Sequence, residues 1–104
     1  MQVTRIYCGL DTNGHDVDAN RVALDLAAKY FPKGHTVYEA NGRWTGQVGV
    51  IDEPTIVVEV LCSSNEVERD QHHHAVQLFA GAYKIHAKQE SVMITSQEMD
   101  AWFV

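Results

Sequence analysis

The chain has 104 residues and carries 8 Lys and Arg against 14 Asp and Glu, which gives a formal net charge of −6 at pH 7. This length fits one domain with a modest core, so we expect a single domain over residues 1–104 that ends in a tail at 96–104. The acidic balance, without any basic run, argues against a nucleic-acid partner.

The N-terminus and the cysteines bear on the compartment. The opening MQVTRIYCGLD lacks the basic flank and long apolar run of a signal peptide, and no stretch approaches membrane-spanning length. We therefore expect a cytoplasmic protein without a membrane partner. Cys8 and Cys62 each end an apolar run, which favours two buried thiols in a reducing compartment.

The first part of the chain predicts a strand and then a helix. Residues 3–10 are rich in β-forming side chains and stop at the turn residues of DTNGHD. Residues 18–30 predict a helix that Asp16 or Asp18 can cap and that FPKG ends. Its apolar stripe follows i+4 steps and is widened by alanines: Val22, Leu26, Tyr30, Ala23 and Ala27.

A hairpin is expected next. Residues 35–40 alternate as a strand does, and the Asn-Gly pair at 41–42 predicts a tight turn or bend. The β-rich run at 50–62 predicts the third strand. Because Pro54 cannot donate a main-chain hydrogen bond, we expect the well-paired part of this strand to begin at Thr55.

The last part of the chain predicts a long helix and a short strand. SSNE offers caps for a helix over residues 66–87, and residues 91–95 predict the final strand. Trp102 and Phe103 in the tail are too apolar to stay in water, so we expect them to pack on this or another subunit. The expected buried stripe of the helix is Val67, Gln71, His74 or Ala75, Leu78, Ala82 and Ile85.

The order β-α-β-β-α-β predicts an α+β, ferredoxin-like sandwich, with two helices on one face of a four-stranded antiparallel sheet. Its first and third strands lie side by side, which would allow Cys8 and Cys62 to be neighbours. In the third strand, alternate residues from Ile56 to Cys62 predict the core face. The opposite set, Thr55 to Leu61, mixes apolar residues with Glu59 and indicates a face covered by another subunit or a ligand.

The sequence offers little conventional chemistry. His72, His73 and His74 are consecutive on a helix, where side chains point about 100° apart and cannot converge on one ion, so we expect surface histidines and no metal site. The glycines at 42, 46 and 49 lack the context of a phosphate loop, and we expect no cofactor.

Two interpretations stay open for the residues that remain. Trp44 is either a lid over a small core or the wall of a site, and Glu53 is either a strand-edge residue that discourages aggregation or a functional carboxylate. Glu90 has the same two interpretations, and Gln89 is either a helix-to-strand connector or part of the same site.

Several blocks carry a family resemblance. The blocks GL at 9–10, FPKGHTVYEANGRW at 31–44, EP at 53–54 and QESV at 89–92 resemble an uncharacterised family of small bacterial proteins. The resemblance covers most of the chain and implies no activity.

A fainter resemblance is to the phage-encoded S-adenosylmethionine (SAM) lyases, formerly described as hydrolases. It rests on the element order, a Gly then an aromatic on the second strand, a Glu opening the third, and a Gln-acid-x-Val entry to the fourth. The resemblance implies a trimer with sites between subunits and a role against host methylation-dependent defence. Glu53 matches the functional Glu, Trp44 falls near the functional Tyr, and Gln89 and Glu90 match the Gln-acid pair.

The implied reaction needs few protein groups. The carboxylate of SAM attacks its own γ-carbon and gives homoserine lactone and methylthioadenosine. Glu53 would anchor the ammonium, and Trp44 would favour the sulfonium by a cation–π contact. Since Trp44 has no hydroxyl, Tyr7 or Tyr38 would supply any role of the Tyr oxygen. The alternative is a non-enzymatic oligomeric module that binds through its open face or its WFV tail.

Overall fold

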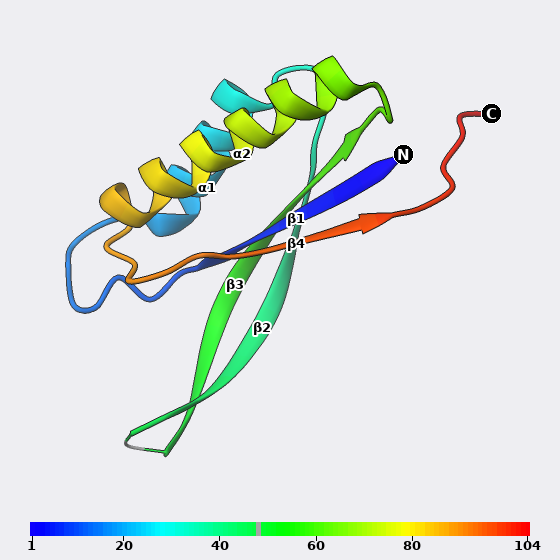
Figure 1. Ribbon diagram of the computed structural model, residues 1–104. Coiled ribbons are helices and arrows are strands. Elements are labelled where there is room, and N and C mark those ends of the chain that lie inside the picture. Colours follow the sequence, from blue (N-terminus) through cyan, green and yellow to red (C-terminus); the bar gives the residue numbers. More distant parts are fainter. Residues whose placement is uncertain (48) are drawn as a thin grey trace.

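The computed structural model describes residues 1–47 and 49–104, and in it two helices cover one face of a four-stranded antiparallel sheet (Figure 1). The strand order is β2-β3-β1-β4, so the first and third strands are central and the predicted ferredoxin-like fold is confirmed. The elements are β1 (Gln2–Gly9), α1 (Ala19–Tyr30), β2 (Thr36–Gly46), β3 (Gly49–Cys62), α2 (Glu66–His86) and β4 (Met93–Glu98).

The core lies between the sheet and the helices. Alternate residues of the central strands point toward the helices, because successive strand side chains point to opposite faces. The fully buried positions of α1 are alanines, which let this helix approach the sheet closely, while Val22, Leu26 and Tyr30 pack beside them partly buried. The largest buried core side chains include Ile6 of β1, Val58 of β3, and Phe79 and Tyr83 of α2.

Both helices begin at the expected caps. The Asp18 carboxylate accepts the Arg21 N–H, so of the two proposed caps Asp18 is the one used. Asn65 caps α2, where its side-chain oxygen accepts the N–H groups of Val67 and Glu68. The boundaries of α1 and α2 agree with the predicted helices to within a residue at either end.

The predicted buried stripe of α2 is wrong. Val67, Leu78 and Ile85 are exposed, and the buried residues of this helix are Val76, Phe79, Ala80 and Tyr83. Both faces of the helix carry apolar residues at helical spacing, so the sequence period fits either face. The aromatic face is the one that packs on the sheet.

The hairpin is longer than predicted. The Asn-Gly pair does not turn the chain: Asn41 pairs with Pro54 and Gly42 with Glu53 in the middle of the β2–β3 ladder. The predicted start of pairing at Thr55 is therefore wrong. The main chain of Pro54 points toward β1, and β1 ends one residue before the position opposite it. Only the Pro54 carbonyl is used there, as the acceptor for the Leu10 N–H, so the missing proline N–H is tolerated. Val48, in the glycine-containing stretch at 42–49, lies outside the described residues.

The two cysteines are buried but are not neighbours. In the antiparallel register Cys8 pairs with Ile56, whereas Cys62 pairs with Gln2 at the other end of the same two strands. Two residues on adjacent strands are neighbours only where the register places them opposite each other. The sequence does not predict the register of β1 against β3.

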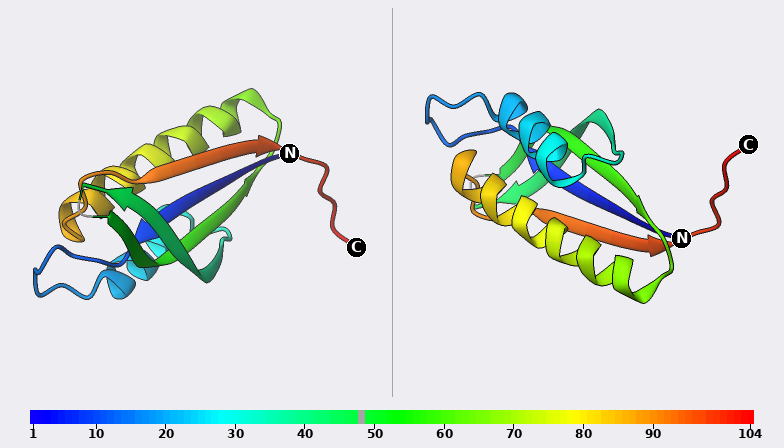
Figure 2. Two further views of the ribbon diagram at one scale, coloured as in Figure 1. Left: turned by 90° about the horizontal axis from the view of Figure 1, so that it is seen from below. Right: turned by 90° about the horizontal axis from the view of Figure 1, so that it is seen from above.

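The last strand is displaced toward the C-terminus and begins at Met93 rather than at residue 91. β4 extends to Glu98, and the Met99 N–H donates to the Met1 carbonyl at 2.8 Å, so the tail begins at 99 rather than 96. The tail runs beyond the sheet in both views of Figure 2. Trp102 and Phe103 are 77% and 82% exposed, so they do not pack firmly on their own subunit.

Only two residues of the histidine triplet lie fully at the surface. His73 and His74 are exposed as expected, but His72 is half-buried against Thr4, with 2.8 Å between Thr4 Oγ1 and His72 Nε2. Within residues 1–47 and 49–104, no group of three or more His, Cys, Asp or Glu side chains could hold a metal ion. Neither described helix combines the length and apolarity needed to cross a membrane.

Candidate functional site

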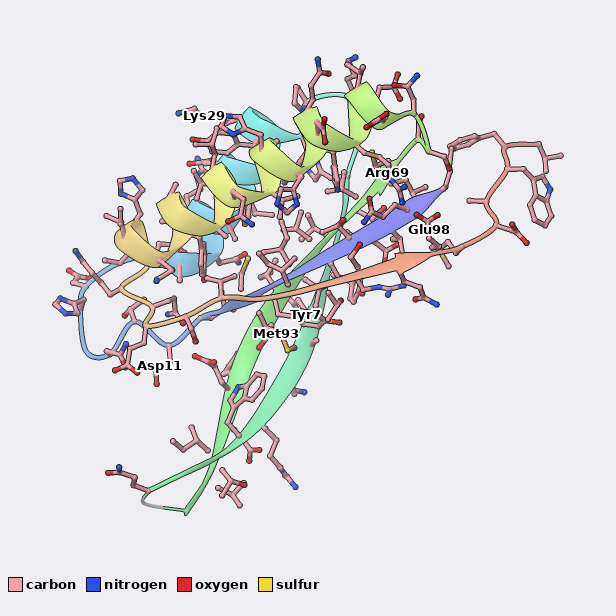
Figure 3. The ribbon with its side chains drawn as sticks, viewed as in Figure 1. Tyr7, Asp11, Lys29, Arg69, Met93 and Glu98 are labelled. Carbon is pink, nitrogen blue, oxygen red and sulfur yellow. The ribbon has the colours of Figure 1, made fainter. Side chains whose placement is uncertain are left out.

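A pocket of about 280 Å³ opens on the sheet face that the helices leave free, at the end of β1. Figure 3 shows Tyr7 and Met93 together on the sheet and Asp11 beyond the end of β1. The lining residues come from strands β1, β2, β3 and β4 and from two connections: Tyr7, Gly9, Asp11, Asn13, Trp44, Glu53, Thr55, Gln89, Glu90, Ser91 and Met93.

The length of the β2–β3 hairpin creates one wall of the pocket. β1 ends at the Gly9–Thr55 pair, while the hairpin continues as an arm made of residues 41–46 and 49–54. This hairpin arm extends past β1 and β4 in Figure 1. The connection from α2 to β4 closes the pocket on the β4 side with residues 89–91.

Glu53 lies on the arm beside the end of β1. It precedes Thr55 by two residues and so shares its face of the sheet, and its carboxylate lies directly over Gly9. Among the described residues, the only hydrogen bond to this carboxylate comes from the Asp11 N–H, with 3.3 Å between Asp11 N and Glu53 Oε2. No described Lys, Arg or His forms an ion pair with Glu53.

Trp44 covers the arm side of the pocket. Gly42 precedes it on the same strand face, and a Cβ built on Gly42 would lie 2.9 Å from Trp44 Nε1 and 3.2 Å from Thr55 Oγ1. The glycine therefore makes room for the indole to lie back along β2 toward Thr55. Trp44 is 43% exposed, so one part of its ring contacts protein while the rest is open to a ligand or a partner.

The two candidate tyrosines lie on the same sheet face in different surroundings. Tyr7 pairs with Val57 on one side and Met93 on the other, and it lines the pocket. Tyr38 also pairs with Val57 but from the β2 side, and it does not line the pocket. Its hydroxyl lies 3.5 Å from Glu59 Oε2, which is already bound by Arg5 Nε at 2.9 Å.

The two loops beside the pocket are joined by hydrogen bonds. Gln89 Nε2 donates to the Asp11 carbonyl, and Asn13 Nδ2 donates to the Lys88 carbonyl at 2.7 Å. The Asp11 carboxylate accepts the Asn13 N–H at 2.9 Å. Gln89 thus lines the pocket and also joins the two loops beside it, and the next residue, Glu90, lines the pocket as well.

Five of the six residues singled out in the sequence line this pocket: Tyr7, Trp44, Glu53, Gln89 and Glu90. Sequence reasoning missed Asp11 and Asn13, which stood out only as turn residues, and Met93, which stood out only as a strand residue. Asp11 belongs to the site because β1 stops two residues before it, which is a property of the sheet register.

The pocket is acidic. Asp11, Glu53 and Glu90 contribute carboxylates, and none of the described lining residues is Lys, Arg or His. Met93 and the rings of Trp44 and Tyr7 supply apolar surface. A pocket with this lining suits an organic cation that also presents an apolar or aromatic group.

The fold and the pocket define a ferredoxin-like domain with an acidic, aromatic-walled pocket on its open sheet face. The chain belongs to the DUF3574 family, described as a protein of unknown function, whose model matches residues 4–103. No curated protein sequence matches the chain.

Solved structures with a similar fold include two of a phage SAM lyase. The lyase in its apo state is 21% identical, with a TM-score of 0.70 over 92% of this chain and 78% of that one. The lyase in complex with S-methyl-5'-thioadenosine is 19% identical, with a TM-score of 0.70 over 93% of this chain and 80% of the other. At this identity the likeness establishes the shared fold.

Proposed function

We propose that this protein is a SAM lyase that cleaves its substrate intramolecularly to methylthioadenosine and homoserine lactone. The observation that carries the proposal is the pocket that gathers Glu53, Trp44 and Tyr7 with two further carboxylates and without a described cationic side chain. The similar fold of the phage SAM lyase supports it.

The reaction balances without a proton transfer. A carboxylate oxygen of SAM forms a bond to its own γ-carbon, the bond from that carbon to sulfur breaks, and the electron pair stays on sulfur. The sulfonium becomes a neutral thioether and the carboxylate becomes a neutral lactone, so the protein needs neither an acid nor a base. Its task is to hold the conformer in which oxygen, γ-carbon and sulfur are in line.

The acidic lining suits this task in two ways. Glu53 carries a charge that no described side chain neutralises, and it would bind the substrate ammonium by a charge-assisted hydrogen bond. A Lys or Arg in the pocket would pair with the substrate carboxylate and weaken it as a nucleophile, and none of the described lining residues is of this kind.

The aromatic wall would act on the sulfonium. Trp44 would attract the cation by its ring face, and the apolar surface of Met93 would exclude water from the reacting groups. Trp44 has no hydroxyl, so we propose that Tyr7 contributes the hydroxyl of the site. Tyr38 cannot take this role, because it lies outside the pocket beside Glu59. Gln89 and Glu90 would contact the nucleoside part of the substrate from the rim.

We also propose that the functional unit is a homo-oligomer, with a trimer favoured, that acts in the cytoplasm. The pocket is open on one side, and the arm beside it exposes Trp44, Val50 and Ile51. A neighbouring subunit would cover these side chains and complete the site. A role against host methylation-dependent defence would follow from depletion of SAM.

The direct test is to incubate the purified protein with SAM and to measure methylthioadenosine by chromatography. Glu53→Gln should lower product formation about 100-fold, because the amide cannot bind the ammonium as a charged partner. Glu39→Gln, an exposed carboxylate outside this pocket, is the matched control and should leave the rate unchanged. Product only at the spontaneous rate from the wild type would refute the lyase.

A non-enzymatic binding module is the second candidate. The exposed Trp102 and Phe103 favour it, because such a tail suits contact with another subunit or protein irrespective of catalysis. Tight binding of methylthioadenosine or SAM without turnover would support this function over the lyase.

A further inference from the structure

Gly9, the last residue of β1, faces the carboxylate of Glu53. A Cβ built on Gly9 would lie 2.6 Å from Glu53 Oε1 and 2.7 Å from Oε2, closer than nonbonded atoms can approach. The φ angle of Gly9 lies outside the left-handed region that favours glycine, so its backbone would accept alanine without strain. The obstacle to a side chain at this position is the carboxylate itself.

A side chain of helix α2 holds the backbone of Gly9 in place by a hydrogen bond. The Leu10 N–H points toward β3, so the Gly9 carbonyl, one residue earlier, points to the opposite edge of β1. There the pairing with β4 has already ended at Tyr7 and Met93, which would leave this carbonyl without a strand partner. The Tyr83 hydroxyl of α2 donates to it instead.

Tyr83 is well suited to hold one position. Its side chain is fully buried, and its ring stacks on Phe79 at a centroid distance of 6.3 Å and an interplanar angle of 7°. Burial, with smaller contributions from Cys8 and Glu53, raises the pKa of the Tyr83 hydroxyl, so it remains a protonated donor across the physiological range. The same strand end continues to Asp11, whose N–H donates to Glu53.

We propose that Gly9, because it has no side chain, provides the space in which the Glu53 carboxylate lies; we call this space the seat. Tyr83 is then a positioning residue that holds Gly9 in place through a hydrogen bond to its carbonyl. The inference rests on the proposed function and adds to it two residues that act through Glu53. One, Gly9, acts by the absence of a side chain, and the other, Tyr83, acts from the helical layer beneath the sheet.

The first test is Gly9→Ala. The added methyl group must displace the carboxylate by about an ångström, and such a displacement is expected to lower turnover of SAM about 100-fold. Gly81→Ala is the matched control, because a Cβ at Gly81 meets nothing within 4 Å, and it should retain full activity. Turnover of Gly9→Ala within twofold of the wild type would overturn the inference.

A double variant tests whether Gly9→Ala acts on Glu53 or disturbs the structure in general. Glu53→Asp shortens the side chain by one methylene and withdraws its carboxylate from the new methyl group. The double variant Gly9→Ala with Glu53→Asp should therefore be at least about tenfold more active than the product of the two single effects predicts. Strictly multiplicative effects would show that Gly9 does not act on Glu53.

Tyr83→Phe tests the support from the helix. If the hydroxyl acts through Glu53, its removal lowers turnover in the wild type but not the residual turnover of Glu53→Gln. An equal loss in both backgrounds would mean a general structural role and would overturn the assignment of Tyr83. Urea unfolding of each variant checks that the protein is folded at the assay temperature.

A protein without lyase activity can still be tested for the seat. If the wild type forms no methylthioadenosine, the proposed function fails, and the unfolding free energy becomes the readout. Because the carboxylate ends a flexible side chain and can move, Gly9→Ala should then change the unfolding free energy only slightly, but less favourably in the Glu53 background than in Glu53→Ala, where the carboxylate is gone. Equal effects in the two backgrounds would overturn the seat.

Discussion

At the residue scale, Glu53 differs in its partners from three carboxylates that form ion pairs. Glu59, Asp52 and Glu98 each pair with an arginine, namely Arg5, Arg43 and Arg69. Glu53 accepts a main-chain N–H instead, which orients the carboxylate without neutralising it. Its charge therefore remains for a cation that comes from outside the chain.

Cys8 should be chemically inert in the native protein. Burial raises the pKa of its thiol to about 12, so at pH 8 only about one molecule in ten thousand carries the thiolate that reacts with alkylating reagents. In Cys62→Ser, which leaves Cys8 as the one thiol, iodoacetamide should label Cys8 in urea and leave it unlabelled in buffer. Mass spectrometry measures both. Labelling of the native protein at the rate seen in urea would contradict the buried placement.

His72 should make the protein less stable in mild acid. Its burial, followed by the charge of His73, lowers the pKa of the imidazole below its usual value of 6.5 in the folded state. The unfolded chain then binds the proton more readily, so the stabilisation is complete above about pH 6.5 and is lost as the pH falls through the lower, folded pKa. Urea unfolding at pH 7.5 and pH 5 measures the loss.

The matched variants for this effect are His72→Gln and His73→Gln. His72→Gln keeps a polar partner for Thr4 and should lose part of the acid sensitivity, whereas the exposed His73 should contribute little. Acid sensitivity that is unchanged in His72→Gln would assign the effect to other groups.

At the element scale, α2 contributes to both the core and the site. Its inner face packs Phe79 and Tyr83 on the sheet, its C-terminal end leads to the pocket residues 89–91, and Tyr83 reaches the end of β1. The C-terminal half of this helix therefore contributes to the geometry of the pocket.

Loss of the α2 cap should destabilise the protein. Asn65→Ala removes the acceptor for two N–H groups at the helix start and should lower the unfolding free energy by about 1 kcal/mol. The neighbouring Ser64→Ala is the control, because Ser64 is exposed and is not the cap. Equal stabilities of the two variants in urea would show that the cap contributes nothing.

The order and type of the elements follow from the sequence, because strands and helices here have distinct periods and α1 has a clear cap in Asp18. The inner face of α2 could not be chosen, since Val67, Leu78 and Ile85 repeat as regularly as the buried residues. The length of the hairpin was hidden by Asn41 and Gly42, which favour a turn in isolation but sit within a long ladder.

Only some residues of the candidate site could be predicted from the sequence. Glu53, Trp44, Gln89 and Glu90 stood out by their place in the chain, and the resemblance added Tyr7 together with Tyr38, which lies outside the pocket. Asp11 and the role of Gly9 depend on where β1 ends against β3, and Tyr83 depends on which face of α2 is buried. These are tertiary properties that local patterns do not contain.

At the scale of the whole molecule, both extremities carry exposed apolar side chains, in addition to those on the outer face of α2. The hairpin arm exposes Val50 and Ile51, and the tail exposes Trp102, Phe103 and Val104. A chain with a net charge of −6 gains solubility from its charge, yet these residues remain in water unless another subunit covers them. We therefore expect homo-oligomers in solution.

Deletion of residues 102–104 should weaken this assembly. The deletion leaves the pairing of Met99 with Met1 intact, so the sheet should remain folded while the subunit contact is lost. Light scattering should report a homo-oligomer for the full chain and a smaller mass for the shortened one, with Asp100→Asn as the control. A monomeric full chain, or an unchanged mass after deletion, would contradict a role of the tail in assembly.

The most direct test of the central claim follows the oxygen atoms of the product in water enriched with oxygen-18. Intramolecular cleavage predicts methylthioadenosine above the spontaneous rate, and homoserine whose γ-oxygen comes from the substrate's own carboxylate. The label should then enter only the carboxyl group, when the lactone opens in water. Label in the γ-hydroxyl would mean attack by water, and the absence of methylthioadenosine above the spontaneous rate would mean that the pocket around Glu53 does not perform this reaction.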